Sequence, residues 1–344
     1  LLRVLASPTI ASKRWEREQF KAPAGAEAVV DTRGGAGVIR IEGTTIGIAA
    51  TVDCNGRYVY LNPRRGAMIA VAEAARNLVC VGARPRAVTN NLNFGNPLKP
   101  EVYYQLQEAV AGMGEACRAF ETPVTGGNVS LYNENPRGAI YPTPTIGMVG
   151  VLDDVAKVVG TAFRSSGDAI VLLGENTEEL GGSEYLKVLH GIVAGDAPQV
   201  DLRAERALQE TMLEIAERRL ARSAHDCAEG GLAVTLAESA IADQDHLLGL
   251  DVSLDDDLSP VALFFGEAQG RIVVSCAETD VDEVLVIAKK HGVPARRIGT
   301  VGAVGGEYSL RAEGGQEIRV PVAELAEAYY TAIPRIMEDA GPAA

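Results

Sequence analysis

The alternation of hydrophobic and polar residues predicts a sheet in the first part of the chain. Short alternating runs rich in β-branched residues are typical of strands, whereas the apolar spacing of 65–81, ended by Gly82, is that of a helix. The predicted strands are 28–30, 38–41, 46–52, 87–89, about 123–131 and 144–151, and a second helix covers about 100–119. Because strands and helices do not alternate regularly, we expect an α+β layer rather than a βαβ ladder.

The length predicts a second domain, because single hydrophobic cores stop growing at about 250–300 residues and the chain has 344. The second unit begins near 164–167, and we place the two domains at 1–157 and 158–344. Its predicted strands are 169–173, 248–253 and 270–276, with further strands before the last helix. Its predicted helices are about 203–222, the segment after Gly230-Gly231, about 280–291 and about 322–338. Gly299, Gly302 and Gly305 lack the spacing of a dinucleotide-binding loop and are interpreted as turns.

Acidic residues outnumber basic ones 46 to 32, which gives a net charge of −14. A nucleic-acid-binding protein needs a basic face, so this class is excluded, but a nucleotide bound through magnesium is not. Five cysteines without paired spacing indicate neither a disulfide framework nor a zinc site.

Other features of the sequence predict the cellular location and indicate how the chain begins and ends. The sequence has no apolar run of about 20 residues, the length that spans a membrane, and no signal peptide opens it. We therefore expect a cytoplasmic protein with no membrane contact. The chain begins at Leu1 in the middle of a pattern, which we interpret as a fragment, and 341–344 are expected to be disordered.

The common nucleotide and hydrolase motifs are absent. The sequence has no Gly-x4-Gly-Lys-Ser/Thr loop, no His-Glu-x-x-His pair and no Gly-x-Ser-x-Gly elbow. What remains is a set of segments rich in acids, amides and glycine. Asp53 follows a strand, where it either ligates a hard cation or holds a turn. Glu73 and Asn77 are four residues apart, so a helix places both on one face, which is either a ligand face or a solvated edge.

Two further segments combine amides with glycine. The segment 89–97 contains four asparagines and is either an elaborate loop or an edge that faces a nucleotide or metal. In 125–130, two glycines allow a ligand to approach the backbone, and alternation places Asn128 and Ser130 on one face; the alternative is a glycine bulge in a strand. In 225–232, acids precede a helix, and His225 there is either a structural residue or a general base.

Taken together, these segments resemble formylglycinamide ribonucleotide amidotransferase, also called phosphoribosylformylglycinamidine synthase, and specifically the C-terminal half of its small bacterial form. The matching segments, in the expected order, are Ser7–Arg14, Asp53–Tyr58, Asn91–Pro97, Gly127–Glu134, Gly181–Leu186 and His225–Leu232. The family belongs to the aminoimidazole-ribonucleotide-synthetase superfamily. The resemblance implies an N-terminal α/β domain, whose sheet pairs into a barrel-like centre, and a C-terminal α+β domain.

The resemblance also implies an activity and partners. Such enzymes are ligases of purine biosynthesis that convert formylglycinamide ribonucleotide, ATP and ammonia to the amidine, ADP and phosphate, with magnesium on the nucleotide. A C-terminal half is expected to be inactive alone. It requires the N-terminal half, a glutaminase subunit that supplies ammonia and a small bridging subunit. A lone half is also expected to self-associate through its exposed sheet.

Site residues follow by position from the same resemblance. Asn90, which stands where the family usually has an aspartate, and Gly127 correspond to ATP-binding positions, Asn128 to a magnesium ligand and Ser130 to a contact of the ribonucleotide. The residues at a second nucleotide and metal site of the larger form are Asp53, Glu73, Asn77 and Asp226. The family's catalytic histidine lies in the other half, so we assign no catalytic residue here.

Two other hypotheses stay open. The chain is alternatively another member of the superfamily, such as a selenophosphate synthetase, a thiamine-phosphate kinase or the aminoimidazole synthetase. Those usually carry an Asp-Gly-x-Gly-x-Lys-type segment where this sequence has 53–57, which disfavours them. The remaining hypothesis is a half whose nucleotide is structural and takes no part in catalysis.

Overall fold

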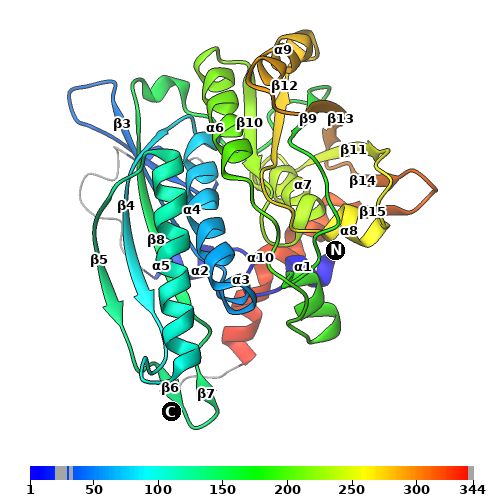
Figure 1. Cartoon of the computed structure of the whole chain (residues 1–344). Helices are drawn as coiled ribbons and strands as arrows, with labels where there is room; N and C mark the ends of the chain where they lie inside the picture. Colours follow the sequence, from blue (N-terminus) through cyan, green and yellow to red (C-terminus); the bar gives the residue numbers. More distant parts are fainter. Residues whose placement is uncertain (20–28, 31–33, 340–344) are drawn as a thin grey trace.

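The structure is a computed structural model that describes residues 1–19, 29–30 and 34–339. Two sheets, each with its own helices, lie side by side in Figure 1. The first predicted strand is present as β1 (Val29–Val30), although its residue 28 lies outside the described residues. The segment 341–344, expected to be disordered, also lies outside them.

The first sheet has the strand order β1-β2-β3-β8-β4-β5. Its other strands are β2 (Gly37–Arg40), β3 (Gly47–Asp53), β4 (Arg84–Asn93), β5 (Val124–Ser130) and β8 (Thr143–Leu152), with a separate small hairpin of β6 (Glu134–Asn135) and β7 (Gly138–Ala139). The strands pair antiparallel, except that β4 and β5 run parallel because α5 connects them.

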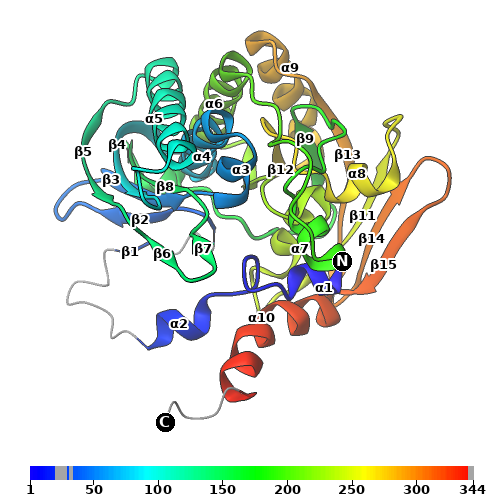
Figure 2. The ribbon, with the colours of Figure 1, turned by 60° about the horizontal axis from the view of Figure 1, so that its bottom comes forward.

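Helices cover one face of this sheet, as Figures 1 and 2 show. They are α3 (Gly56–Leu61), α4 (Pro63–Cys80) and α5 (Pro100–Phe120). Asn62 caps the start of α4, since its side chain accepts from the Arg65 backbone N–H, and Pro63 is the first helical residue. Nearly all of α4 is buried, so it forms the centre of the first core.

The opposite face of the first sheet is apolar and exposed. Ile39 and Ile48 are cross-strand partners that are 54% and 44% exposed, and Val52 is 71% exposed. On β3 these side chains alternate with buried ones, so they lie on the face away from α4. Val149 of β8 continues the surface, which we call the open sheet face.

The second sheet has the order β10-β12-β9-β13-β11-β14-β15 and lies between two layers of helices. Its strands are β9 (Ala169–Leu173), β10 (Ala221–Asp226), β11 (Leu248–Leu254), β12 (Ile272–Cys276), β13 (Ala295–Val304), β14 (Glu307–Ala312) and β15 (Glu317–Pro321). All side chains of β9 are buried, as expected for a strand covered on both faces.

One helical layer consists of α6 (Leu202–Glu217) and α9 (Val281–His291), and the other of α7 (Gly231–Ile241), α8 (Pro260–Phe265) and α10 (Val322–Asp339). The short elements are α1 (Leu2–Leu5), α2 (Arg14–Glu18), two 3-10 turns (Val155–Lys157 and Glu278–Asp280) and a π-helical turn (Leu186–His190). Figure 2 shows α1 beside α10, so the start of the chain packs on the second unit.

The sequence prediction was wrong in three places. The helix predicted over 203–222 ends at Glu217, because Arg219 has a φ of 58° that stops the helix, and the strand β10 follows. Gly299 and Gly302 lie inside β13 instead of in turns; a Cβ on Gly299 would lie 2.3 Å from the Asp251 carbonyl oxygen. The segment 90–93 is part of β4 rather than a loop.

The predicted fold class is confirmed, because each unit combines a sheet with helices of its own. Helix α4 forms the interface between the two units, since it packs on its own sheet and also on α6 and β10. We call this interface the joint. The domain boundary between 157 and 158 stays a prediction. All five cysteines are free thiols. None of the helices in the described part of the chain is long and apolar enough to cross a membrane.

Candidate functional site

The predicted ATP, magnesium and substrate residues meet at the carboxyl ends of two parallel strands. In the register of β4 and β5, Asn90 pairs with Gly127, Asn91 with Asn128, and Asn93 with Ser130. Two segments about forty positions apart therefore form one polar edge, which we call the asparagine edge. β5 pairs only with β4 among the described strands, so its outer side is open. Carboxyl ends of parallel strands are common positions for ligand sites in sheets with helices on their faces.

Contact between the two strands explains why glycine occupies position 127. A Cβ there would lie 2.1 Å from Asn90 Oδ1 and 2.7 Å from the Asn90 carbonyl oxygen. Asn90 is half-buried and lies between Val88 and Leu92, the core-facing residues of β4. Its carboxamide therefore covers the Gly127 backbone on the helical side of the sheet.

The other face of the asparagine edge carries exposed amides. Asn128 Nδ2 lies 3.3 Å from Asn91 Oδ1 and donates to it. Ser130 is half-buried, and its hydroxyl donates to Asn133 Oδ1 at 3.2 Å. Carboxamide oxygens are acceptable magnesium ligands, but they supply no charge. This edge therefore fits magnesium that arrives with phosphate oxygens, and the amides alone would hold it weakly.

The residues of the predicted second site also meet, at the joint between the two units. Asp53 ends β3, Glu73 and Asn77 lie on α4, and Asp226 ends β10. Asn77 Nδ2 donates to Asp53 Oδ2 at 3.2 Å. Glu73 and Asn77 are only 4% and 9% exposed, so the interpretation of this helix face as a solvated edge was wrong.

Arg76 is the central cation of this acidic cluster, and it was missed at the sequence level. It is fully buried, donates to Glu205 at 2.5 Å, and lies 3.7 Å from Asp226 and 3.8 Å from Glu73. Its position one turn from Glu73 on a mostly apolar helix was the available signal. It thereby links α4 to α6 and β10.

Burial and mutual repulsion set the protonation of these carboxyl groups. Withdrawal from water, then the charge of Glu229, raises the pKa of Asp53. Burial, then the charge of Asp53, likewise raises the pKa of Glu73. Burial acts in the same direction on Asp226, but His225 and Arg76 outweigh it and lower the pKa of Asp226.

His225 is held by carboxylates on both sides. Its Nε2 lies 2.9 Å from Glu238 and its Nδ1 lies 3.5 Å from Asp226. Burial opposes the charged ring, but hydrogen bonds to these two carboxylates raise the pKa of His225 to about 10. A histidine that is already protonated cannot act as a general base, so the geometry favours the structural interpretation.

The acidic cluster fits a bound cation in its chemistry. Asp226 Oδ2 is buried and has no hydrogen-bond partner, and Glu73, Asp226 and Glu229 line a cavity of about 160 Å³. Among the described residues, however, no three acidic, histidine or cysteine side chains already surround one point at ligand distance. A divalent ion here would therefore need further ligands, such as phosphate oxygens or water.

A larger cavity of about 750 Å³ adjoins the small one, since both are lined by Ile10, His225 and Glu238. Lys13, Arg14 and Arg17 of the N-terminal segment line it. Lys13 Nζ donates to three backbone carbonyl oxygens of 8–11, which fixes the local conformation of this segment. A lining that combines basic with acidic residues is suited to a polyphosphate with its divalent ion.

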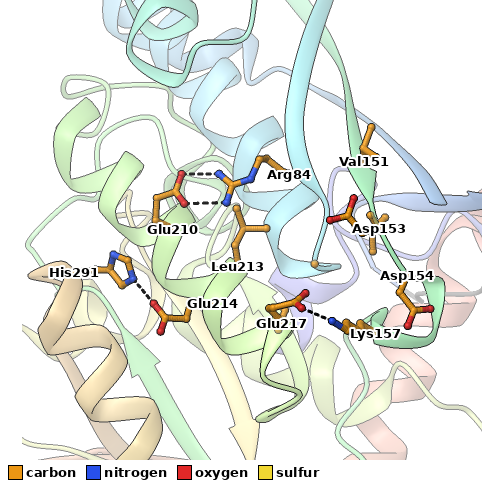
Figure 3. A pocket seen from close by; sticks show the side chains of 13 residues that line it. Arg84, Val151, Asp153, Asp154, Lys157, Glu210, Leu213, Glu214, Glu217 and His291 are labelled. Atoms are coloured by element: carbon orange, nitrogen blue, oxygen red, sulfur yellow. Dashed lines mark hydrogen bonds and ion pairs between the residues drawn. The ribbon is translucent and has the colours of Figure 1, made fainter. Parts of the chain in front are cut away.

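A further cavity of about 380 Å³ lies elsewhere on the joint, between α6 and the ends of β4 and β8 (Figure 3). Arg84 donates to Glu210 at 2.7 and 3.1 Å, and His291 contacts Glu214 at 2.7 Å. Lys157 and Glu217 form another pair across it. None of the predicted site residues lines this cavity. We therefore interpret it as part of the interface between the two units, which these ion pairs stabilise.

Comparison with known proteins agrees with the fold. The sequence matches the AIR synthase related protein, N-terminal domain over 33–152, and the C-terminal domain of the same family over 165–310. The chain belongs to this family. The resemblance to phosphoribosylformylglycinamidine synthase is confirmed, because PurL subunits match nearly the whole chain at about 50% identity.

Two curated relatives show the extent of this match. The PurL subunit of Moorella thermoacetica is 50% identical over 337 residues, covering 98% of this chain and 45% of the relative. The PurL subunit of Chlorobium luteolum is 50% identical over 341 residues, covering 96% of this chain and 44% of the relative. The chain thus spans about half the length of the curated relatives it matches.

Solved structures share the fold at lower identity. Thermotoga maritima PurL complexed with FGAR has a TM-score of 0.78 at 20% identity, covering 94% of this chain and 53% of that chain. The same protein complexed with ATP has a TM-score of 0.73 at 22% identity, covering 96% and 52%. The structure of PurLQS from Thermotoga maritima has a TM-score of 0.69 at 22% identity, covering 88% and 48%.

Proposed function

We propose that this chain is the C-terminal half of a phosphoribosylformylglycinamidine synthase and is inactive without its N-terminal half. Support comes from the register that joins Asn90 to Gly127 and Asn91 to Asn128, in a chain half as long as its PurL relatives. In the reaction, ATP phosphorylates the amide oxygen of formylglycinamide ribonucleotide, and ADP leaves. Ammonia then attacks the activated carbon, and phosphate leaves with the former amide oxygen to give the amidine.

Each residue of the asparagine edge has a role in this proposal. The Gly127 backbone approaches the phosphates, and Asn90 supports it from the helical side of the sheet. Asn128 supplies an amide oxygen to magnesium, and Ser130 contacts the ribonucleotide. Magnesium, when bound, neutralises charge that develops on the transferred phosphoryl group. The chain positions these groups, and positioning accounts for most catalysis in phosphoryl transfer. We assign no catalytic histidine to the described residues.

The acidic cluster supports a second, structural nucleotide site. Asp53, Glu73, Asn77 and Asp226 would hold its divalent ion, and the neighbouring cavity of about 750 Å³ is large enough for a nucleotide. If only this site binds ATP, the chain is a nucleotide-holding scaffold, the alternative function. The buried Asp226 Oδ2, which accepts no hydrogen bond, is the observation that favours this alternative.

The open sheet face supports the proposed assembly. Exposed Ile39, Ile48 and Val52 form an apolar surface on one side of the first sheet. We propose that the sheet of the N-terminal half covers it, and that a glutaminase subunit and a small bridging subunit complete the enzyme in the cytoplasm. One of the similar solved structures is PurLQS, which supports such an assembly.

ATP consumption tests the activity directly. The chain is mixed with the separately expressed N-terminal half, magnesium, ATP and ammonia, with or without formylglycinamide ribonucleotide. We expect ADP to form only in the complete mixture and to fall at least about tenfold with Asn128→Ala, a loss of about 1.4 kcal/mol in transition-state stabilisation. ATP that stays intact in every mixture, although calorimetry detects its binding, would favour the scaffold.

A further inference from the structure

Asn133 lies in the turn between β5 and β6 and has no role in the proposed site. The turn brings this residue back to the ends of the two parallel strands. Tyr132, just before it, has a φ of 61°, in the left-handed region that residues other than glycine rarely adopt. The Tyr132 backbone N–H donates to the Gly95 carbonyl oxygen at 3.0 Å. The side chain of Asn133 is thereby placed beside Ser130, the last residue of β5.

The carboxamide nitrogen of Asn133 is bound to both strand ends. Its Nδ2 donates to the Phe94 carbonyl oxygen at 3.0 Å and to the Ser130 carbonyl oxygen at 2.9 Å. The Asn133 backbone N–H also donates to the Phe94 carbonyl oxygen, at 3.1 Å. Phe94 directly follows β4, whereas Ser130 ends β5. Because carbonyl oxygens can only accept, these contacts fix which end of the carboxamide is nitrogen and which is oxygen.

This orientation decides how the hydroxyl group of Ser130 is used. Asn133 Nδ2 also lies 3.1 Å from Ser130 Oγ, but an amide nitrogen has two hydrogens, and the two carbonyl oxygens engage both. Asn133 Oδ1, at 3.2 Å, carries no hydrogen, so the Ser130 hydroxyl donates to it. Ser130 Oγ then has a lone pair but no proton for a ligand. A ligand at this half-buried side chain must therefore supply the hydrogen.

The neighbouring side chain on β4 is an acceptor for the same reason. Asn93 is the register partner of Ser130, so both side chains lie on one face of the sheet. Asn93 Nδ2 donates to the Asn91 carbonyl oxygen at 3.0 Å and to the Thr143 carbonyl oxygen at 3.4 Å. Both of its amide hydrogens are engaged, and Oδ1 is left for a ligand. This end of the asparagine edge therefore presents two neighbouring acceptors.

Ligand groups differ in whether they can donate to such acceptors. A ribose hydroxyl and an amide N–H donate, whereas the oxygens of a phosphate group mainly accept hydrogen bonds near neutral pH. A phosphate bound by a serine side chain needs the hydroxyl as its donor, and Asn133 already holds the proton of Ser130. The geometry therefore disfavours the phosphate of a ribonucleotide at Ser130 and favours its ribose or its amide.

We propose that Asn133 is a positioning residue that keeps Ser130 an acceptor, so that Ser130 binds a ribose hydroxyl or an amide N–H of the substrate and not its phosphate. This inference rests on the proposed function, in which Ser130 contacts the ribonucleotide. It adds a residue to that site and identifies the class of substrate group that Ser130 binds.

Calorimetric titrations of the full chain in complex with its N-terminal half test the inference. Formylglycinamide ribonucleotide and magnesium AMPPCP are titrated separately, so that each ligand gives its own affinity. The variants are Asn133→Ala, Ser130→Ala and the double variant. The matched control is Glu134→Gln, one position away, because the hydrogen bonds of the Glu134 side chain go to Asn96 and Lys99.

We expect Asn133→Ala to weaken binding of the ribonucleotide at least about threefold, since the freed hydroxyl can turn its hydrogen towards the donor of the ligand. AMPPCP affinity should change less than about twofold, whereas a residue that only stabilised the strand ends would affect both ligands. In the Ser130→Ala background, loss of Asn133 should change ribonucleotide affinity less than about twofold, because Asn133 acts through Ser130. Glu134→Gln should change either affinity less than about twofold.

Two simpler ligands identify the substrate group that Ser130 binds. Ribose 5-phosphate and inorganic phosphate are titrated into the wild-type complex and into Ser130→Ala. Weaker binding of ribose 5-phosphate by Ser130→Ala, with inorganic phosphate unaffected, would assign a ribose hydroxyl as the donor. A loss confined to the whole ribonucleotide would assign the amide. Weaker binding of inorganic phosphate by Ser130→Ala would overturn the inference, because phosphate requires Ser130 to donate.

The remaining outcomes also separate this inference from the proposed function. If Asn133→Ala misfolds by circular dichroism, Asn133→Leu replaces it, since leucine has a similar volume and no hydrogen-bonding group. Unchanged ribonucleotide affinity in the folded variant, or an equal loss for AMPPCP, would overturn the inference and leave the proposed function intact. A wild-type complex that fails to bind the ribonucleotide would overturn both.

Discussion

Gly127 illustrates how one missing side chain shapes the asparagine edge. Since its Cβ would lie 2.1 Å from Asn90 Oδ1, Gly127→Ala must displace the Asn90 carboxamide. We expect magnesium-dependent ATP affinity of the complex with the N-terminal half to fall at least about tenfold. Gly126→Ala is the matched control, because a Cβ at Gly126 meets nothing within 4 Å. Equal affinities of both variants, measured by calorimetry, would show that this contact is irrelevant to the nucleotide.

Glu267 gives a pH dependence of stability. It is buried and accepts from the backbone N–H groups of Gly230 and Glu184. Burial, then the charge of Glu229, raises the pKa of Glu267 from 4.5 to about 7. The folded-state pKa thus lies above the unfolded value, so this group's contribution is fully present below pH 4.5 and is lost as the pH rises through about 7.

Glu267→Gln should therefore flatten the pH dependence, since glutamine stays neutral. Relative to wild type, the variant should gain free energy of unfolding between pH 5 and pH 8, by about 3 kcal/mol at most. Urea unfolding at both pH values measures this, with Glu324→Gln on the exposed start of α10 as control. A pH profile shared by wild type and Glu267→Gln would disprove a raised pKa.

At the scale of elements, helix α4 holds the two units together through Arg76. Removing this cation leaves Glu205, Asp226 and Glu73 buried without their common partner. Arg76→Met should lower the free energy of unfolding by about 3–5 kcal/mol, as for other broken buried ion pairs. Arg84→Met is the matched control, because Arg84 also joins the units through Glu210 but its side chain is 43% exposed.

The control should lose no more than about 1 kcal/mol, the usual value for an exposed pair. Urea unfolding measures both variants. Similar losses in Arg76→Met and Arg84→Met would mean that the buried cluster does not stabilise the joint.

Elements with strong local patterns were predicted well, and those without them were not. Helix α4 has an apolar face, a capping asparagine and a proline at its first position. β10, with the sequence ARSAHD, lacks the β-branched residues that mark strands and is placed by pairing with β12. Gly299 is a strand residue because it pairs with both β11 and β9, and β11 passes too close to leave room for a side chain. Such contacts between distant segments leave no local pattern.

The residues of the candidate site were likewise predictable only in part. The amide and acid residues were identifiable from their types and from the resemblance. The register that pairs Asn90 with Gly127 was not, because it depends on how α5 returns the chain to the sheet. Arg76 was overlooked, since its position near Glu73 on an apolar helix was the one local signal, and its carboxylate partners on α6 and β10 are distant in the sequence.

For the whole molecule, the open sheet face predicts self-association. Val52 is 71% exposed on this face, and burial of such side chains is favourable at about 25 cal/mol per Å². Sedimentation of the wild-type chain should show reversible association, and Val52→Lys should weaken it at least about tenfold. Val304→Lys, at a valine 64% exposed on the second unit, is the control. A wild-type chain that stays monomeric at all concentrations would refute the prediction.

We expect β4 and β5 together to hold a magnesium-bound triphosphate. This is tested by a crystal structure of this chain with its N-terminal half, soaked with magnesium and AMPPCP. Phosphate density should lie against the Gly127 backbone, and the metal should lie within ligand distance of the Asn128 carboxamide oxygen. Nucleotide bound only at the acidic cluster of Asp53, Glu73 and Asp226, with the asparagine edge empty, would contradict it.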